Sequence, residues 1–296
     1  MKKSNTSLIR RGIWYVLGLI LFYAPFALYQ KGLLLILKNG NGREQDWHAL
    51  CLRMPLLSLL SGKGLQILTI GGISIILLFL SAFIWGPFFC GKLCFAGALP
   101  EYLSRIVPDK FKINWYKAIN PAPVRYGFLA GFIIAPIVSG SIVCSLCNYS
   151  FAQRLLTGGF WGELGYLGST TILTAFLWLI LFGIFSKGGR GYCNFLCPIG
   201  AAQNLIYSIG VKLPFTYKLH FSKEKCVSCG ICVKECSMGS LQNSTEGITY
   251  RIHNCITCHQ CTAVCPKGAI SYGTGKGLWK EAPNKQVEVE NKAIEN

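Results

Sequence analysis

The chain has 296 residues, of which 52% are hydrophobic and only 14% are charged; it contains 15 cysteines and has a formal net charge of +17 at pH 7. This composition is too apolar for an ordinary soluble domain and is typical of a membrane protein. The positive balance fits a cytoplasmic membrane surface and requires no nucleic-acid partner. The cysteine spacings favour metal ligation in a reducing compartment over a disulfide framework.

Four apolar runs follow a basic N-terminal segment, and each has roughly the 20 residues that a bilayer core requires. The sequence therefore predicts four transmembrane helices. The first run is expected to be a retained span and not a signal peptide, because it is long, contains Pro25 and lacks a small-residue cleavage site behind it. The runs extend over about Gly12 to Tyr29, Leu65 to Phe89, Val124 to Val143 and Gly168 to Phe185.

Lysine and arginine are most frequent after the second and fourth runs. The segment from Gly91 to Arg125 alone holds six of them. The positive-inside rule then predicts a multi-pass protein of the inner (cytoplasmic) membrane, with both termini and the C-terminal domain in the cytoplasm.

A C-x3-C motif follows both the second and the fourth run, as CGKLCFAG and CNFLCPIG. The first and third runs also share an Ala-Pro pair, so we expect two parallel repeats that bring the motifs together. If each motif is helical, its two thiols face the same way. Four thiolates suit a third Fe–S cluster, or zinc or copper, at the membrane interface. Packing residues or redox-sensing dithiols remain the alternatives for the four cysteines, Cys90, Cys94, Cys193 and Cys197.

Three other cysteines lie on the predicted outer side. Cys144 and Cys147 form a C-x-x-C that predicts either an outer redox or metal site, or a pair of packing cysteines. Cys51, taken alone, is expected to be structural.

The C-terminal part carries two complete C-x2-C-x2-C-x3-C runs, the pattern of a bacterial two-cluster ferredoxin. Zinc and disulfides are the alternatives, but two full four-cysteine runs are very specific. Because the fourth thiolate of each run lies about a helical turn further on, it reaches the other cluster. We therefore predict one [4Fe-4S] cluster on Cys226, Cys229, Cys232 and Cys265, and a second on Cys255, Cys258, Cys261 and Cys236.

These patterns divide the chain into a four-helix membrane domain over residues 1–210, an α+β 2[4Fe-4S] ferredoxin-like domain over 211–275, and a disordered polar tail over 276–296. No flavin motif, haem motif or nucleophile triad is present. We therefore expect an electron carrier or an oxidoreductase subunit and not a stand-alone catalyst.

With its paired C-x3-C motifs, most clearly RGYCNFLCPIGA, and its C-terminal two-cluster pattern, the sequence resembles the NapH-like membrane ferredoxin-type family over about Gly12 to Tyr272. This resemblance implies electron transfer between a quinol or cytoplasmic donor and a partner redox enzyme in a complex. The transfer could cross the membrane. The alternatives are a quinol dehydrogenase subunit that uses the quinone pool, and a copper- or zinc-handling redox protein that uses the C-x3-C pairs.

Overall fold

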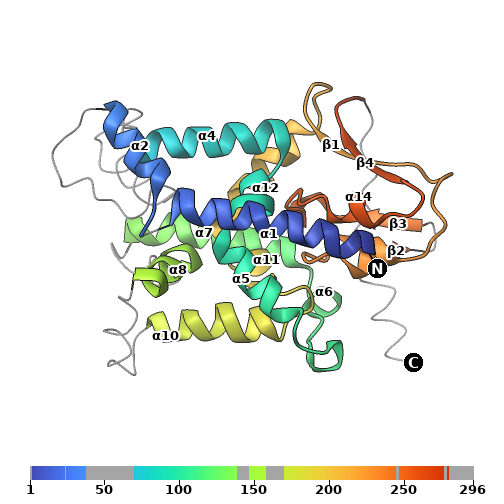
Figure 1. Cartoon of the computed structure of the whole chain (residues 1–296), viewed down its shortest axis with the longest axis horizontal. Coiled ribbons are helices and arrows are strands. Elements are labelled where there is room, and N and C mark those ends of the chain that lie inside the picture. Colours follow the sequence, from blue (N-terminus) through green and yellow to red (C-terminus); the bar gives the residue numbers. More distant parts are fainter. Residues whose placement is uncertain are drawn as a thin grey trace.

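A computed structural model describes residues 2–23, 25–37, 70–138, 147–157, 170–244, 247–276 and 279. Long helices run side by side through most of the molecule, and four short strands lie together at one end, where the N-terminus also lies (Figure 1). The N-terminal half contains α1 (Lys2–Phe22), α2 (Leu28–Leu37), α4 (Ile70–Trp85), η1 (Phe89–Leu93), α5 (Phe95–Ser104), η2 (Asp109–Phe111), α6 (Trp115–Ala118) and α7 (Pro121–Val138). There follow α8 (Asn148–Thr157), α10 (Thr170–Ala175), η4 (Phe176–Ile184), α11 (Gly191–Phe195), α12 (Pro198–Gly210), β1 (Lys218–Phe221), α13 (Ile231–Lys234), β2 (Leu241–Ser244), β3 (Gly247–Tyr250), η5 (Ile252–Asn254), α14 (Gln260–Val264) and β4 (Ile270–Gly273).

The prediction of four transmembrane helices is wrong for the part of the chain that the structure describes. None of its helices combines the length and the apolarity needed to cross a membrane. The 16 residues of α4 are apolar but fall short of the roughly 20 that a bilayer core requires. The 21 residues of α1 are long enough but include four basic side chains. The counted runs also continued across Pro25 and Pro87, where the structure has helix ends.

The helical part packs around α12 and α5, the two helices that follow the C-x3-C motifs. Helix α12 contacts both α4 and α7, while α5 contacts η4 and α1. Trp178 of η4 is fully buried, and its Nε1 donates to the carbonyl oxygen of Ala96 at 2.8 Å. Its neighbours in the core include Tyr23 and Tyr192, so residues far apart in the sequence enclose the start of α5.

The strands and two short helices form the predicted ferredoxin-like domain. Strand β1 pairs antiparallel with β4, with Lys218 opposite Gly273, and β2 pairs antiparallel with β3. The apolar sides of both strand pairs form one core cluster with α13 and α14. Trp279, in the segment predicted to be a disordered tail, is buried on this core, where it stacks on Phe221 and Tyr250.

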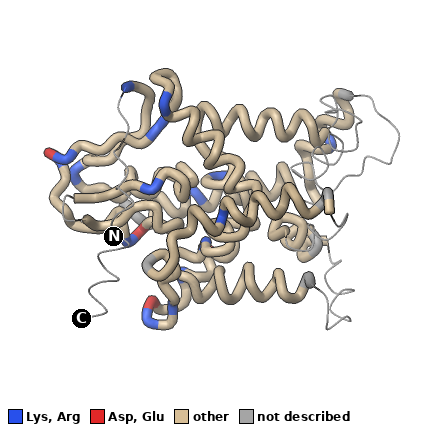
Figure 2. Tube along the Cα trace, turned by 180° about the vertical axis from the view of Figure 1, so that it is seen from behind, with Lys and Arg blue, Asp and Glu red and all other residues tan. Residues whose placement is uncertain are grey.

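Positive charge is concentrated in this half of the molecule. Figure 2 shows lysine and arginine gathered around the strands and the adjacent loops, while α4 and the α10–η4 pair run away from them without charged residues. The helical ends far from the ferredoxin-like domain are therefore mainly apolar among the described residues.

Candidate metal centres

Two cavities in the ferredoxin-like domain are each lined by four cysteines. Each set takes three cysteines from one run and the fourth from the other run. Helices α13 and α14 pack against each other, so the last cysteine of each run lies beside the other run's cavity. The first cavity is lined by Cys226, Cys229, Cys232 and Cys265, and the second by Cys255, Cys258, Cys261 and Cys236. Both thiol sets suit a [4Fe-4S] cluster, and the crossed ligation stays a prediction.

The loop of the second cavity lies directly against the first C-x3-C motif. Gly91, one residue after Cys90, has so little space that an added Cβ would overlap the carbonyl oxygen of Ile256 and lie 3.1 Å from the backbone nitrogen of Cys258. The Tyr15 hydroxyl donates to the carbonyl oxygen of Gly91 at 2.6 Å and fixes this segment. The contact therefore depends on glycine, because no side chain would fit.

The second C-x3-C motif contacts the same cavity from another direction. Asn194, one residue after Cys193, is fully buried and donates from its Nδ2 to the carbonyl oxygen of Met238 at 2.8 Å. Met238 lies two residues after Cys236, which lines the second cavity. Both C-x3-C motifs therefore contact residues that line the second cavity.

The four C-x3-C cysteines are brought together, although not on continuous helices as expected. Cys90 and Cys193 lie in the short helices η1 and α11. Cys94 and Cys197 are extended residues, with ψ values of 102° and 111°, that precede α5 and α12. The expectation that both cysteines of a motif lie on one continuous helix is thus wrong, because the helix ends between them in each motif. The two motifs share this break, as expected for an internal repeat.

Burial and mutual proximity govern the electrostatics of these four thiols. Burial raises the pKa of Cys193 to about 12, the thiols of Cys197 and Cys94 raise it further, and the Arg190 guanidinium opposes them. Burial also raises the pKa of Cys90, with contributions from the other three thiols. Neighbouring thiols therefore disfavour the ionisation of Cys90 and Cys193, and a nearby positive charge such as a metal ion would favour it.

Two buried guanidinium groups lie beside the four thiols in matching positions. Arg190 Nη1 lies 2.6 Å from where a Cβ of Gly97 would stand, and Arg125 Nη2 occupies the same kind of space at Gly200. These glycines are the third residues after Cys94 and Cys197. In both halves of the repeat, the missing side chain leaves the space that an arginine guanidinium occupies. In addition, Gln203 Nε2 donates to Cys90 Sγ at 3.2 Å. The site is therefore suited to hold an anionic thiolate centre.

Arg125 also connects this site to the second cavity. Its Nη1 donates to the carbonyl oxygen of His253 at 2.8 Å, two residues before Cys255. The hydroxyl of Tyr126 and Nδ1 of His253 lie 2.7 Å apart. Arg125 and Arg190, the basic residues near the two motifs, therefore both donate to backbone carbonyl groups of the protein.

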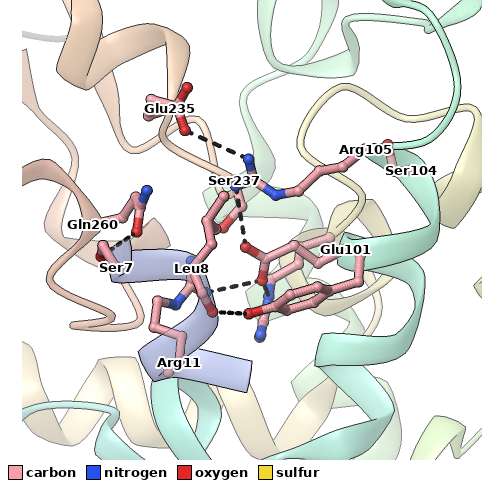
Figure 3. A network of polar contacts seen from close by, with 12 residues as sticks. Ser7, Leu8, Arg11, Glu101, Ser104, Arg105, Glu235, Ser237 and Gln260 are labelled. Atoms are coloured by element: carbon pink, nitrogen blue, oxygen red, sulfur yellow. Dashed lines mark hydrogen bonds and ion pairs between the residues drawn. The ribbon is translucent and has the colours of Figure 1, made fainter. Parts of the chain in front are cut away.

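A buried ion network, which sequence reasoning missed, is centred on Glu101 and includes Arg11 and Arg105 (Figure 3). The same carboxylate also pairs with Arg190. Glu101 of α5 accepts from Arg190 Nε at 2.5 Å and from Arg11 Nη2 at 3.0 Å. Burial opposes ionisation of Glu101, but the guanidinium groups of Arg11, Arg190 and Arg105 outweigh it and lower its pKa to about 2. The available signal was that Glu101 is the lone carboxylate between residues 47 and 108 of an apolar sequence.

The remaining predicted site is only partly within the described residues. Cys51 and Cys144 lie outside them. Cys147 is half-buried just before α8 and contributes to raising the pKa of Tyr192, the neighbour of Cys193. Across the described ranges, no three His, Cys, Asp or Glu side chains are arranged to hold a single metal ion.

Comparison with known proteins matches both cysteine systems. The 4Fe-4S dicluster domain family matches residues 225–270, and a second family, described as a 4Fe-4S binding domain, matches twice, at 67–114 and 170–216. The two matches of the second family contain the two C-x3-C motifs. No solved structure matches the chain.

Curated relatives extend the similarity beyond the motifs. The ferredoxin-type protein NapH of Haemophilus influenzae is 31% identical over 57% of this chain and 53% of its own length. NapH of Escherichia coli is 26% identical over 62% of this chain and 58% of its own length. YccM of Escherichia coli, whose name marks it only provisionally as an electron transport protein, is 26% identical over 50% of this chain and 40% of its own length. The chain thus spans about half the length of the curated relatives it matches. Together with the two cysteine systems, these matches show that the chain is similar to ferredoxin-type proteins of the NapH kind and carries two kinds of 4Fe-4S domain.

Proposed function

We propose that this protein exchanges single electrons with a redox partner protein and holds three iron–sulfur centres in a row for that purpose. The residues that line the two ferredoxin cavities would hold two [4Fe-4S] clusters, and the four C-x3-C cysteines would hold a third. When bound, the clusters supply one-electron carriers. The observation that carries the proposal is the backbone contact of Gly91 with Ile256 and Cys258, which places the first C-x3-C motif directly against the second cavity.

The protein's own groups support a third centre at the C-x3-C site. Arg125 and Arg190 bring two buried positive charges to four half-buried thiols, which lowers the cost of several thiolates in one place. Gln203 adds a hydrogen bond to the sulfur of Cys90, and such bonds tune the potential of a thiolate-bound cluster. The family match at both motifs, described as 4Fe-4S binding, supports the same cofactor.

Iron analysis of anaerobically purified protein tests the proposal. We expect about twelve irons, with matching acid-labile sulfide, per wild-type chain, and about eight in a variant carrying both Cys193→Ser and Cys197→Ser. The ferredoxin EPR signals of the dithionite-reduced state should survive in that variant. Cys147→Ser serves as the comparison, because it removes a half-buried thiol outside both motifs, and it should retain about twelve irons.

Other results would favour the rival functions. Equal iron contents of about eight in the wild type and the double variant would contradict a third cluster. Stoichiometric copper or zinc that disappears with Cys193 and Cys197 would indicate a metal-handling protein. Reduction of the clusters by an added quinol would favour a quinol dehydrogenase subunit.

We also propose that the protein resides at the cytoplasmic membrane, with lipid in contact with the apolar helix faces on the side away from the ferredoxin-like domain. Contiguous exposed apolar surface of this kind marks membrane or protein contacts. Large apolar side chains are exposed on five helical elements: Ile13 and Leu17 on α1, Leu35 on α2, Leu80 on α4, Ile134 and Val138 on α7, and Phe176 on η4.

Cell fractionation checks this location. The protein should sediment with membranes and be released by detergent but not by high salt. Replacing Leu80 and Ile134 together by Lys should shift it toward the supernatant. The same replacement at Ile106 and Phe111, which are exposed near the ferredoxin-like domain, should leave its distribution unchanged. Wild-type protein in the salt-washed supernatant would contradict the proposal.

A further inference from the structure

Building on the proposed function, we infer that the exposed first cysteine loop is the docking surface for a redox protein with an acidic contact face. We call residues 223–231 the outer loop and the equivalent residues 252–260 the inner loop. The two loops carry the same cysteine spacing and lead into the short helices α13 and α14. Differences between them therefore report on their surroundings and not on the cluster motif.

The surroundings of the two loops are opposite. Val227 of the outer loop is 57% exposed, whereas Ile256 at the equivalent position of the inner loop is 2% exposed. Ile231 is 42% exposed, and its equivalent, Gln260, is 1% exposed. Gly91 covers the inner loop, and Ser7 of α1 donates to Gln260 Oε1 at 2.8 Å. A partner protein can therefore approach the outer loop but not the inner one.

The outer loop also brings the first cavity close to the surface. Lys225, Val227 and Lys267 line this cavity together with its cysteines, and Cys229 is exposed. A protein seated on Val227 would be separated from the first cavity by little more than that side chain. The outer loop is thus the short route between a partner's redox centre and the cysteine sites.

The charges around the outer loop define the kind of partner. Lysine occupies positions 225 and 234 of the first cysteine run, whereas the equivalent positions of the second run hold Asn254 and Ala263. Four exposed lysines belong to the outer loop, to α13 or to the lining of the first cavity: Lys223, Lys225, Lys234 and Lys267. The nearby carboxylates are Glu224 and Glu235, and Glu235 lies 3.5 Å from Arg105 in an ion pair.

Exposed lysines alone would describe an ordinary solvated surface. An apolar centre with a charged rim, by contrast, is the arrangement of a protein interface. Val227, which lines the cavity beside Lys225 and Lys267, and the exposed Ile231 of the same loop match that arrangement. Because charge complementarity guides association, the basic rim selects an acidic protein face.

Binding measured with both proteins oxidised tests this surface without requiring electron transfer. The probes are a plant-type ferredoxin of net negative charge and a cytochrome c of net positive charge. We expect the ferredoxin to bind more tightly, and its affinity to fall as salt is raised. The double variant Lys225→Glu with Lys267→Glu should weaken its binding by about tenfold or more. Reduction of the protein by the pre-reduced ferredoxin should slow in parallel.

The control changes the same amount of charge elsewhere. Lys212→Glu with Lys276→Glu alters two exposed lysines near the other end of the β1–β4 ladder, and it should leave ferredoxin binding unchanged. Equal weakening by both double variants, or tighter binding of the cytochrome, would overturn the docking surface. Clusters that dithionite cannot reduce in the wild type would instead overturn the proposed function, whatever the binding result.

Discussion

Replacing Glu101 by Gln is expected to destabilise the folded protein by about 3–5 kcal/mol, the usual cost of removing one partner from a buried charge network. The carboxylate is fully buried, and it accepts from Arg11 and Arg190, which are also buried. The variant leaves their positive charges without a counter-charge. Chemical unfolding followed by the helical circular dichroism signal should show the loss as a lower midpoint.

A surface pair provides the control for Glu101. Asp109 and Lys112 form an ion pair at 2.8 Å, and Asp109 is largely exposed. Because exposed pairs contribute only about 0–1 kcal/mol, Asp109→Asn should barely move the midpoint. Similar midpoints for Glu101→Gln and the wild type would show that the network does not stabilise the fold.

The pH dependence of the same network has a defined sign. The folded-state pKa of Glu101 is lowered to about 2 from an ordinary value of 4.5. The stabilisation from this carboxylate is therefore complete above about pH 4.5 and is lost as the pH falls toward 2. In Glu101→Gln this part of the acid dependence should be absent, which separates it from the general acid sensitivity of the protein.

Gly91→Ala is expected to force the ferredoxin-like domain away from the first C-x3-C motif. The new Cβ would overlap the carbonyl oxygen of Ile256, a backbone atom that cannot turn away as a flexible side chain can. Overpacking of this kind costs about 1–3 kcal/mol or more. Hydrogen exchange should become faster over residues 255–261, while the first cavity and its cluster signal are retained.

Gly127→Ala is the matched control for Gly91→Ala. Gly127 lies within α7, and an added Cβ would meet no atom within 4 Å. Alanine should therefore leave exchange in the inner loop unchanged and stabilise α7 by up to about 1 kcal/mol. Wild-type exchange rates over residues 255–261 in Gly91→Ala would contradict the tight contact.

The ferredoxin-like part could be anticipated from sequence because its information is local. Eight cysteines at fixed spacings specify the two loops, and the structure gathers them into the two predicted sets of four around two cavities. The pairing of the C-x3-C motifs was also foreseeable, because the two motifs repeat within one chain. Their internal break before α5 and α12 was not, since the i, i+4 spacing fits a continuous helix equally well.

The contacts between the two parts could not be derived from sequence, because they depend on residues with no common motif. Gly91 reads as an ordinary glycine inside a motif, and Asn194 as an ordinary polar residue, until the backbone of the other domain is placed against them. The prediction of four transmembrane helices from the apolar runs failed for a related reason. Hydropathy counted across Pro25 and Pro87 ignores where helices end, so the count overstated the length of single helices.

The covered inner loop has a consequence for how the protein matures. Ile256 and Thr257 have almost no contact with solvent, and the walls over them include the backbone at Gly91. We therefore expect the inner site to take up iron and sulfide more readily before the ferredoxin-like domain packs onto the helices than after. The outer site, where Cys229 is exposed, should remain open to loading, repair and attack by oxygen in the folded protein. The asymmetry between two otherwise equivalent loops thus predicts an order of assembly.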